Sequence, residues 1–227
     1  MTVVASTRSL KWLILRMEIR RFCSSTKSLA FIPLTFLAIA ASFSPQLPTP
    51  FIPVFGVVFA GLESQYNNIL FRTPNEFQAF SLFPVKWKPV VLAKNLAAVL
   101  ITLLVCCAVA IPTLYFSPVV VTPHDVTQAL LYLLTVVFPL LHAGNLRSVQ
   151  HPRPEAGLGT DDIAECGVTV VIAGIASIPY LVIIALPYSS LLCLMYAAVL
   201  SAYWFGVSVP ATAATIGKGQ QRLCQAS

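Results

Sequence analysis

Charge is scarce in this chain of 227 residues. Only 10% of the residues are charged, whereas 57% are apolar, and the mean hydropathy is +0.83. A soluble domain carries charge on about a quarter of its residues. The composition therefore excludes an ordinary soluble domain and predicts an all-α integral membrane protein.

Signatures of catalysis and metal binding are also missing. The six cysteines show no CxxC spacing, and the three histidines are scattered along the chain. No GxxxxGK[ST] phosphate loop occurs, since Gly217-Lys218-Gly219 is a short basic tail. The chain is expected to be no enzyme and to hold no cofactor or metal. A membrane enzyme stays an alternative class, although its one acidic cluster, Asp161, Asp162 and Glu165, has no histidines nearby at metal-ligand spacing.

Six apolar stretches are expected to be transmembrane helices. Most approach the roughly 20 residues that a helix needs to cross about 30 Å of hydrocarbon. They cover residues 28–44, 51–71, 89–116, 126–142, 167–186 and 189–211. The expected organisation is an N-terminal element over 1–27, a six-helix domain over 28–211 and a tail over 212–227.

If the six stretches cross the membrane in turn, one side of the membrane has no lysine or arginine. All 14 lie in the N-terminal segment, in or beside the second-to-third and fourth-to-fifth connections, or in the tail. Positive residues in short loops stay in the cytoplasm. Both termini are therefore expected to be cytoplasmic. The expected location is a bacterial inner (plasma) membrane. The charges flank spans and form no soluble patch, so nucleic acid is not an expected partner.

The N-terminal element predicts a separate helix. From Arg8 to Phe22, apolar residues recur at three- and four-residue spacing with basic residues between them. This pattern is typical of an amphipathic helix in the membrane interface, with its cations at the lipid head groups. The alternative is a basic flank that only sets orientation.

A short helix is expected in the connection between spans two and three. Thr73 suits the capping position, Pro74 the first helical position, and Glu76 completes a capping box. Pro84 disfavours helical geometry in the residue before it, so the helix should end near there. Its aromatic residues Phe77 and Phe80 would share a face, which requires either a protein groove or the bilayer as cover.

Polar residues near the end of the second span are candidates for a pathway. Glu63 and Asn67 are four residues apart and would share one helical face. An acid near hydrocarbon faces the bundle interior or water, which favours a lining role. The alternative is that the helix leaves the bilayer near Leu62 and that Glu63 is simply solvated.

Two segments carry a resemblance to a known family. The stretch from Asn68 to Asn95 includes the proline-containing basic turn Pro84-Val-Lys-Trp-Lys88 and ends in the pair Lys94-Asn95. It resembles the cytoplasmic loop and third-helix entry of ABC-2 type transporter permeases. The stretch from Gly144 to Pro154 is similar to that family's glycine-asparagine-x-x-serine segment and its basic, proline-rich end. With the N-terminal helix and the spans, the resemblance covers nearly the whole chain.

The resemblance implies a permease subunit of an ATP-driven transporter. Such a subunit pairs with a second permease half, as a homodimer or heterodimer, and with ABC ATPase subunits that bind ATP and Mg. The short helix would be the coupling helix that docks on the ATPase. The residues expected at this contact are Thr73, Glu76, Phe77, Phe80, Lys86 and Trp87. Glu76 as a cap only, and Trp87 as an ordinary interface anchor, are the alternatives.

The short external connections and the few membrane charges bear on the substrate. Many family members have a sizeable external segment before the last span, which this chain lacks. Handling of a large polymer is therefore not indicated, and export of a hydrophobic or amphipathic substrate is expected. The segment 144–165 is interpreted either as an ATPase contact or as a flexible acidic loop. A non-transporting structural subunit of a larger membrane complex, built on the same fold, is the alternative function.

Overall fold

The part of the chain that the structure describes is helical. The computed structural model describes residues 7–24, 31–43, 51–62, 70, 86–118, 120–150 and 189–226, with scattered positions between 171 and 183. The helices are α1 (Thr7–Ser24), α2 (Phe31–Ser42), α3 (Phe51–Gly61), α6 (Trp87–Phe116), α7 (Pro123–Gln150), α9 (Ser189–Tyr203) and α10 (Val209–Ala226), with the π-helical turn η2 (Trp204–Ser208) before α10. No strand occurs within these ranges. The all-helical class expected from composition is confirmed there.

Three helices are long and apolar enough to cross a membrane. They cover Trp87–Phe116, Pro123–Val149 and Leu191–Lys218, and they are compatible with an integral membrane protein. α2 is apolar but shorter, and α3 is shorter still. Most of the expected span 167–186 lies outside the described residues. The described part of the chain thus supports three spans of the six expected.

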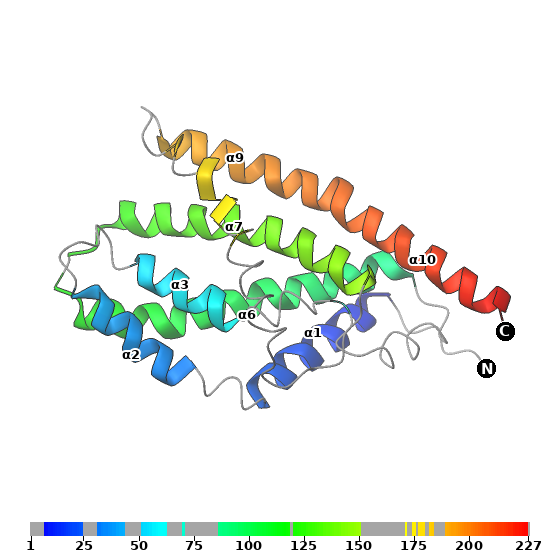
Figure 1. The fold of residues 1–227 in the computed structure, drawn as a ribbon, viewed down its shortest axis with the longest axis horizontal. Coiled ribbons are helices and arrows are strands. Elements are labelled where there is room, and N and C mark those ends of the chain that lie inside the picture. Colours follow the sequence, from blue (N-terminus) through cyan, green and yellow to red (C-terminus); the bar gives the residue numbers. More distant parts are fainter. Residues whose placement is uncertain are drawn as a thin grey trace.

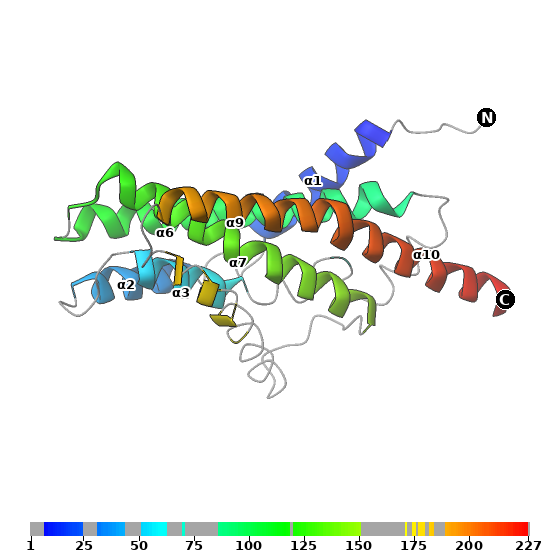
Figure 2. The same cartoon turned by 90° about the horizontal axis from the view of Figure 1, so that it is seen from above.

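The long helices run side by side, with α6 at the centre of the packing. Figures 1 and 2 show α6, α7 and the continuous α9–α10 helix along the longest axis of the molecule. α6 contacts α1, α2, α3 and α10, and α1 crosses obliquely beside its first half. The start of α6 and the ends of α7 and α10 point toward the same end of the molecule (Figure 1).

Apolar side chains are divided between this core and the outer surface. Val91, Ile101 and Val109 of α6 are fully buried in the main cluster. Between 28% and 44% of the apolar window of each long helix is buried within the chain, so more than half of each window is uncovered. Apolar helix faces of this kind need lipid or a further protein to cover them.

The beginning of α7 shows how this chain caps a helix. Thr122 Oγ1 accepts a hydrogen bond from the backbone N–H of Asp125 at 3.3 Å, and Asp125 Oδ2 accepts one from the N–H of Thr122 at 2.8 Å. Pro123 occupies the first helical position. The expected coupling helix relies on the same Thr-Pro-x-acid pattern, but Thr73 to Glu76 lies outside the described residues.

Two helices continue beyond the expected ends of their spans. The span expected over 126–142 belongs to α7, which runs on to Gln150, so the start of the expected loop 144–165 is helical. Asn145 and Ser148 are buried there, and packing overrides the weak helix propensity of Gly144. The expected tail 212–227 is likewise helical as far as Ala226.

The π-helical turn explains how the last long helix tolerates a proline. Pro210 has no N–H to donate four residues back, and its ring crowds the preceding turn. Directly before it, the N–H of Val209 donates instead to the carbonyl of Trp204, five residues back. This wider turn lets α9 and α10 form one helix.

Candidate functional site: a buried polar cluster around Lys94

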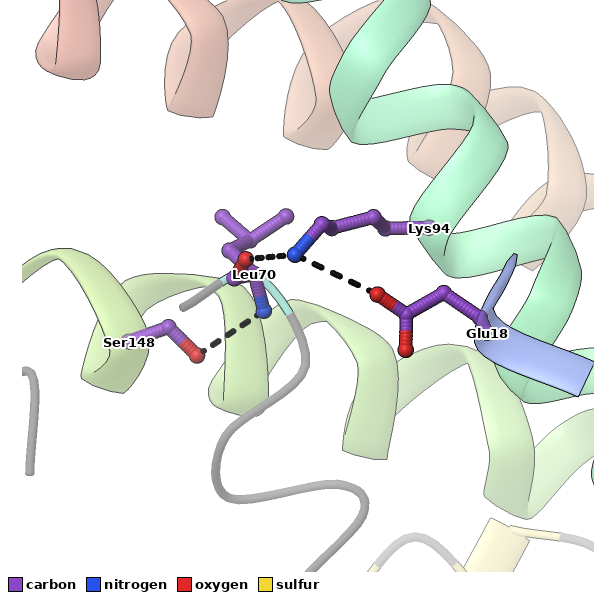
Figure 3. Close-up of polar contacts among 4 residues, drawn as sticks. All are labelled: Glu18, Leu70, Lys94 and Ser148. Atoms are coloured by element: carbon purple, nitrogen blue, oxygen red, sulfur yellow. Dashed lines mark hydrogen bonds and ion pairs between the residues drawn. The ribbon is translucent and has the colours of Figure 1, made fainter. Parts of the chain in front are cut away.

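A buried lysine joins three parts of the chain. Lys94 lies two turns into α6, and its side chain is almost completely buried. Its Nζ lies 3.4 Å from Glu18 Oε1 of α1 and donates a hydrogen bond to the backbone carbonyl of Leu70 (Figure 3). An ammonium group in such surroundings requires a counter-charge and hydrogen-bond acceptors, and Glu18 and Leu70 supply them.

The backbone of Leu70 is shared with α7. The N–H of Leu70 donates to Ser148 Oγ at 3.3 Å, and the Ser148 hydroxyl donates to the carbonyl of Gly144 at 2.7 Å. Leu70 is therefore held on one side by Lys94 and on the other by Ser148, as Figure 3 shows. We call Glu18, Leu70, Lys94 and Ser148 the Lys94 cluster.

The Lys94 cluster brings together the two segments on which the family resemblance was based. Lys94 belongs to the first segment and Ser148 to the second. In the structure both side chains bond the backbone of the same residue, Leu70. Sequence reasoning placed both segments on one face of the membrane but could not show that they meet at a single residue.

Glu18 is the member of the cluster that sequence reasoning missed. It is the only acidic residue before Glu63, and it sits among the basic residues of α1. Its position four residues after Ile14 places it on the buried face of the helix, because Ile14 is also buried. A lone acid in register with buried apolar residues is the signal that would have identified it.

Two asparagines beside the cluster have unsatisfied side chains. Asn95 follows Lys94 and Asn145 follows Gly144, and both side chains are completely buried. Neither amide has a hydrogen-bond partner in the described part of the chain. Leaving a buried polar group unsatisfied costs about 1–3 kcal/mol, so a water, another group or a rearrangement is needed to satisfy these amides.

A second polar contact lies at the π-helical turn. His142 Nδ1 of α7 is 2.8 Å from Ser208 Oγ of η2, and the His142 ring packs edge-on against Tyr203. Trp204 is buried in the same turn and packs against Phe138, and its indole N–H has no partner among the described residues. Sequence reasoning treated His142 as isolated. In the structure, the π-helical turn η2 contains its partner, Ser208.

Most of the expected site residues lie outside the described residues. These are Glu63, Asn67, Thr73, Glu76, Phe77 and Phe80. Lys86 is exposed just before α6. Trp87 is only 6% exposed and faces α10, since a Cβ placed on Gly217 would lie 4.0 Å from its Cδ1 atom. Contact of these residues with a partner stays a prediction.

Acidic, histidine and cysteine side chains do not gather into a metal site in the described ranges. Comparison of the chain with protein-family models, with curated proteins and with solved structures gave no match.

Proposed function

We propose that the chain is the permease subunit of an ATP-driven ABC-2 type transporter. It would contribute six transmembrane helices, with both termini in the cytoplasm of a bacterial cell, and would pair with a second permease half and with ABC ATPase subunits. The observation that carries this proposal is the convergence of the Lys94 and Ser148 segments on Leu70. The three long apolar helices support the membrane location.

The Lys94 cluster supports a coupling role for the loop, because it ties the residue before the loop to the surrounding helices. The expected coupling helix lies between Leu70 and α6, so the residue before the loop is bonded to the helix after it through Lys94. Ser148 extends the connection to α7, and Glu18 extends it to α1. A push by the ATPase on the loop would then reach three helices together, because coupling travels through contiguous hydrogen-bonded and packed groups.

The capping box at Thr122 supports the helix expected in that loop. Thr122-Pro123-His124-Asp125 begins a helix in the structure, and Thr73-Pro74-Asn75-Glu76 has the same arrangement of Thr, Pro and acid. The chain therefore uses this pattern as a helix start at least once.

The uncovered apolar surface bears on the partner and the substrate. Less than half of each long apolar window is buried, which leaves surface for lipid and for a second permease half. A hydrophobic or amphipathic substrate fits a bundle with so few charges, and Glu63 and Asn67 are the proposed pathway residues. In this proposal the buried amides of Asn95 and Asn145 gain partners when the bundle rearranges during the transport cycle.

Purification of the tagged chain from its native membrane tests the ATPase partner. We expect an ATP-binding subunit to co-purify, and we expect Phe77→Asp with Phe80→Asp to release it. The matched control is Phe43→Asp, an exposed aromatic residue at the end of α2. If no ATPase co-purifies, or if the Phe77 and Phe80 changes leave the assembly intact, the coupling role is wrong and a structural subunit becomes the better account.

Stimulation of ATP hydrolysis tests the substrate class. The reconstituted complex is expected to hydrolyse ATP faster when amphiphiles or lipids are added. Stimulation by a soluble ion, with no response to lipids or amphiphiles, would contradict a hydrophobic or amphipathic substrate.

A further inference from the structure

The helix α1 presents two faces of different chemistry. Ile14, Leu15 and Glu18 are buried against the rest of the chain. On the other side, Trp12 is 66% exposed and Met17 is 60% exposed. The apolar residues of α1 are therefore not all directed to the core, which differs from a simple amphipathic pattern.

The exposed face mixes large apolar side chains with arginines. Leu13, Arg16, Met17 and Arg20 are all exposed and follow one another at three- and four-residue spacing, so they form one continuous strip. Trp12 adjoins the strip, four residues before Arg16. We call these five residues the α1 strip.

The ion pair with Lys94 removes the one negative charge from this helix surface. Glu18 is the only acidic residue of α1, and its carboxylate is turned inward to Lys94 of α6. The exposed charges of α1 are consequently all positive: Lys11, Arg16, Arg20 and Arg21. The pair also fixes the rotation of the helix, so that the α1 strip faces outward.

The position of α1 indicates what lies against the strip. α1 packs on α6, one of the three helices long and apolar enough to span a membrane, and it crosses that helix obliquely (Figure 2). Glu18 of α1 pairs with Lys94, only two turns from the start of α6, so in the proposed membrane location α1 lies near the boundary between acyl chains and head groups. Leu, Met and Trp side chains enter that boundary, and guanidinium groups bind phosphates at it.

We propose that the α1 strip binds anionic phospholipid at the bilayer surface. Its apolar side chains are buried at the acyl boundary, and Arg16 and Arg20 pair with acidic head groups. An acidic protein groove would satisfy the arginines but would leave Trp12, Leu13 and Met17 to be covered separately. The proposal rests on the membrane location in the proposed function, and it is independent of transport and of any ATPase.

Fluorescence of Trp12 provides the test, because the other two tryptophans, Trp87 and Trp204, are buried. The full-length chain is placed in nanodiscs of neutral lipid that contain a minor fraction of brominated lipid, either phosphatidylglycerol or phosphatidylcholine. The Trp12→Phe variant gives the background from the buried tryptophans. We expect stronger quenching of Trp12 by the anionic brominated lipid, with a preference that weakens as salt is added.

Two variants with the same charge change identify the residues responsible. Arg16→Gln with Arg20→Gln is expected to lower the preference for the anionic lipid by about 25-fold at low salt, since each basic residue near an anionic surface contributes about fivefold. Lys88→Gln with Lys218→Gln, two exposed lysines outside α1, is expected to keep the preference.

Each of three other outcomes would overturn the proposal. Equal quenching by the two brominated lipids would mean contact with the interface without selection of charge. Absence of quenching by both would mean that protein covers the strip. An equal loss in the Lys88 and Lys218 variant would mean that net charge alone attracts the lipid. Recovery of the chain without detergent would instead refute the membrane location itself.

Discussion

At the residue scale, Lys94 joins two other parts of the chain to α6. It lies in the buried part of α6 and is bonded to both α1 and the backbone of Leu70. A buried ion pair adds little net stability compared with apolar residues of the same size, but removing one partner is costly. Lys94 is therefore expected to position α1 and Leu70 relative to α6. It is expected to add little to the free energy of folding.

Replacement of Lys94 by methionine tests this role. Lys94→Met keeps most of the side-chain volume but takes the ammonium group away from the Glu18 carboxylate and the Leu70 carbonyl, at an expected cost of about 3–5 kcal/mol. The measurement is the thermal unfolding midpoint in detergent. Glu18→Gln combined with Lys94→Met should recover a large part of the loss.

Lys88→Met is the matched control for this prediction, since Lys88 is an exposed lysine on the same helix. It should change stability by less than about 0.5 kcal/mol. If Lys94→Met is as mild as Lys88→Met, or if the double variant is no better than the single one, the ion pair does not have the proposed role.

At the element scale, the π-helical turn determines how the last long helix meets α7. It lies directly before Pro210 and places Ser208 against His142. Thr212 then donates back to the Ser208 carbonyl at 2.9 Å, so α10 resumes directly after the turn. The turn therefore serves both the continuity of the helix and its attachment to its neighbour.

Replacement of Ser208 by alanine tests the attachment. Ser208→Ala deprives the His142 ring of its partner and should cost about 1 kcal/mol, a typical value for a hydrogen bond between membrane helices. Ser201→Ala is the matched control, because among the described residues the Ser201 hydroxyl bonds only the Ala197 carbonyl of its own helix, at 2.7 Å. A double-mutant cycle with His142→Phe should show coupling for Ser208 and none for Ser201; coupling of equal size at both serines would contradict the attachment.

At the scale of the whole molecule, basic residues mark one end of the three long helices. The start of α6 and the ends of α7 and α10 share one end of the molecule, and they carry Lys86, Lys88, Arg147 and Lys218. The connection from α6 to α7, over residues 117–122, has no lysine or arginine. The rule that cations stay in the cytoplasm predicts that the first end is cytoplasmic and the second is external.

Labelling of single cysteines in intact cells tests this orientation. In a background without the six native cysteines, Val120→Cys should react with a membrane-impermeant maleimide added outside, because Val120 is 87% exposed in the α6 to α7 connection. Lys218→Cys should react only after the cells are permeabilised. The reverse pattern would show the opposite orientation, and labelling of both in intact cells would show that the chain does not span the membrane between them.

The helices were easier to predict than the contacts between them. The span expected over 89–116 matches α6 closely, because its apolar run is long and uninterrupted. The ends of α7 and α10 were missed, since burial of Asn145 and the wider turn at Trp204 override the local signals of Gly144 and Pro210. Lys94 and Ser148 were each placed in a motif, but their common partner is the backbone of Leu70. A leucine side chain gives no sign that its backbone groups bond two distant residues.

The amino-acid sequence by itself determined the class of protein and the separation of charge, because hydropathy and the placement of cations are properties of composition and order. The tertiary structure alone decided that Glu18 pairs with Lys94 and that two distant segments meet at Leu70. Such contacts depend on the rotation and crossing of whole helices, which the pattern along one helix does not specify.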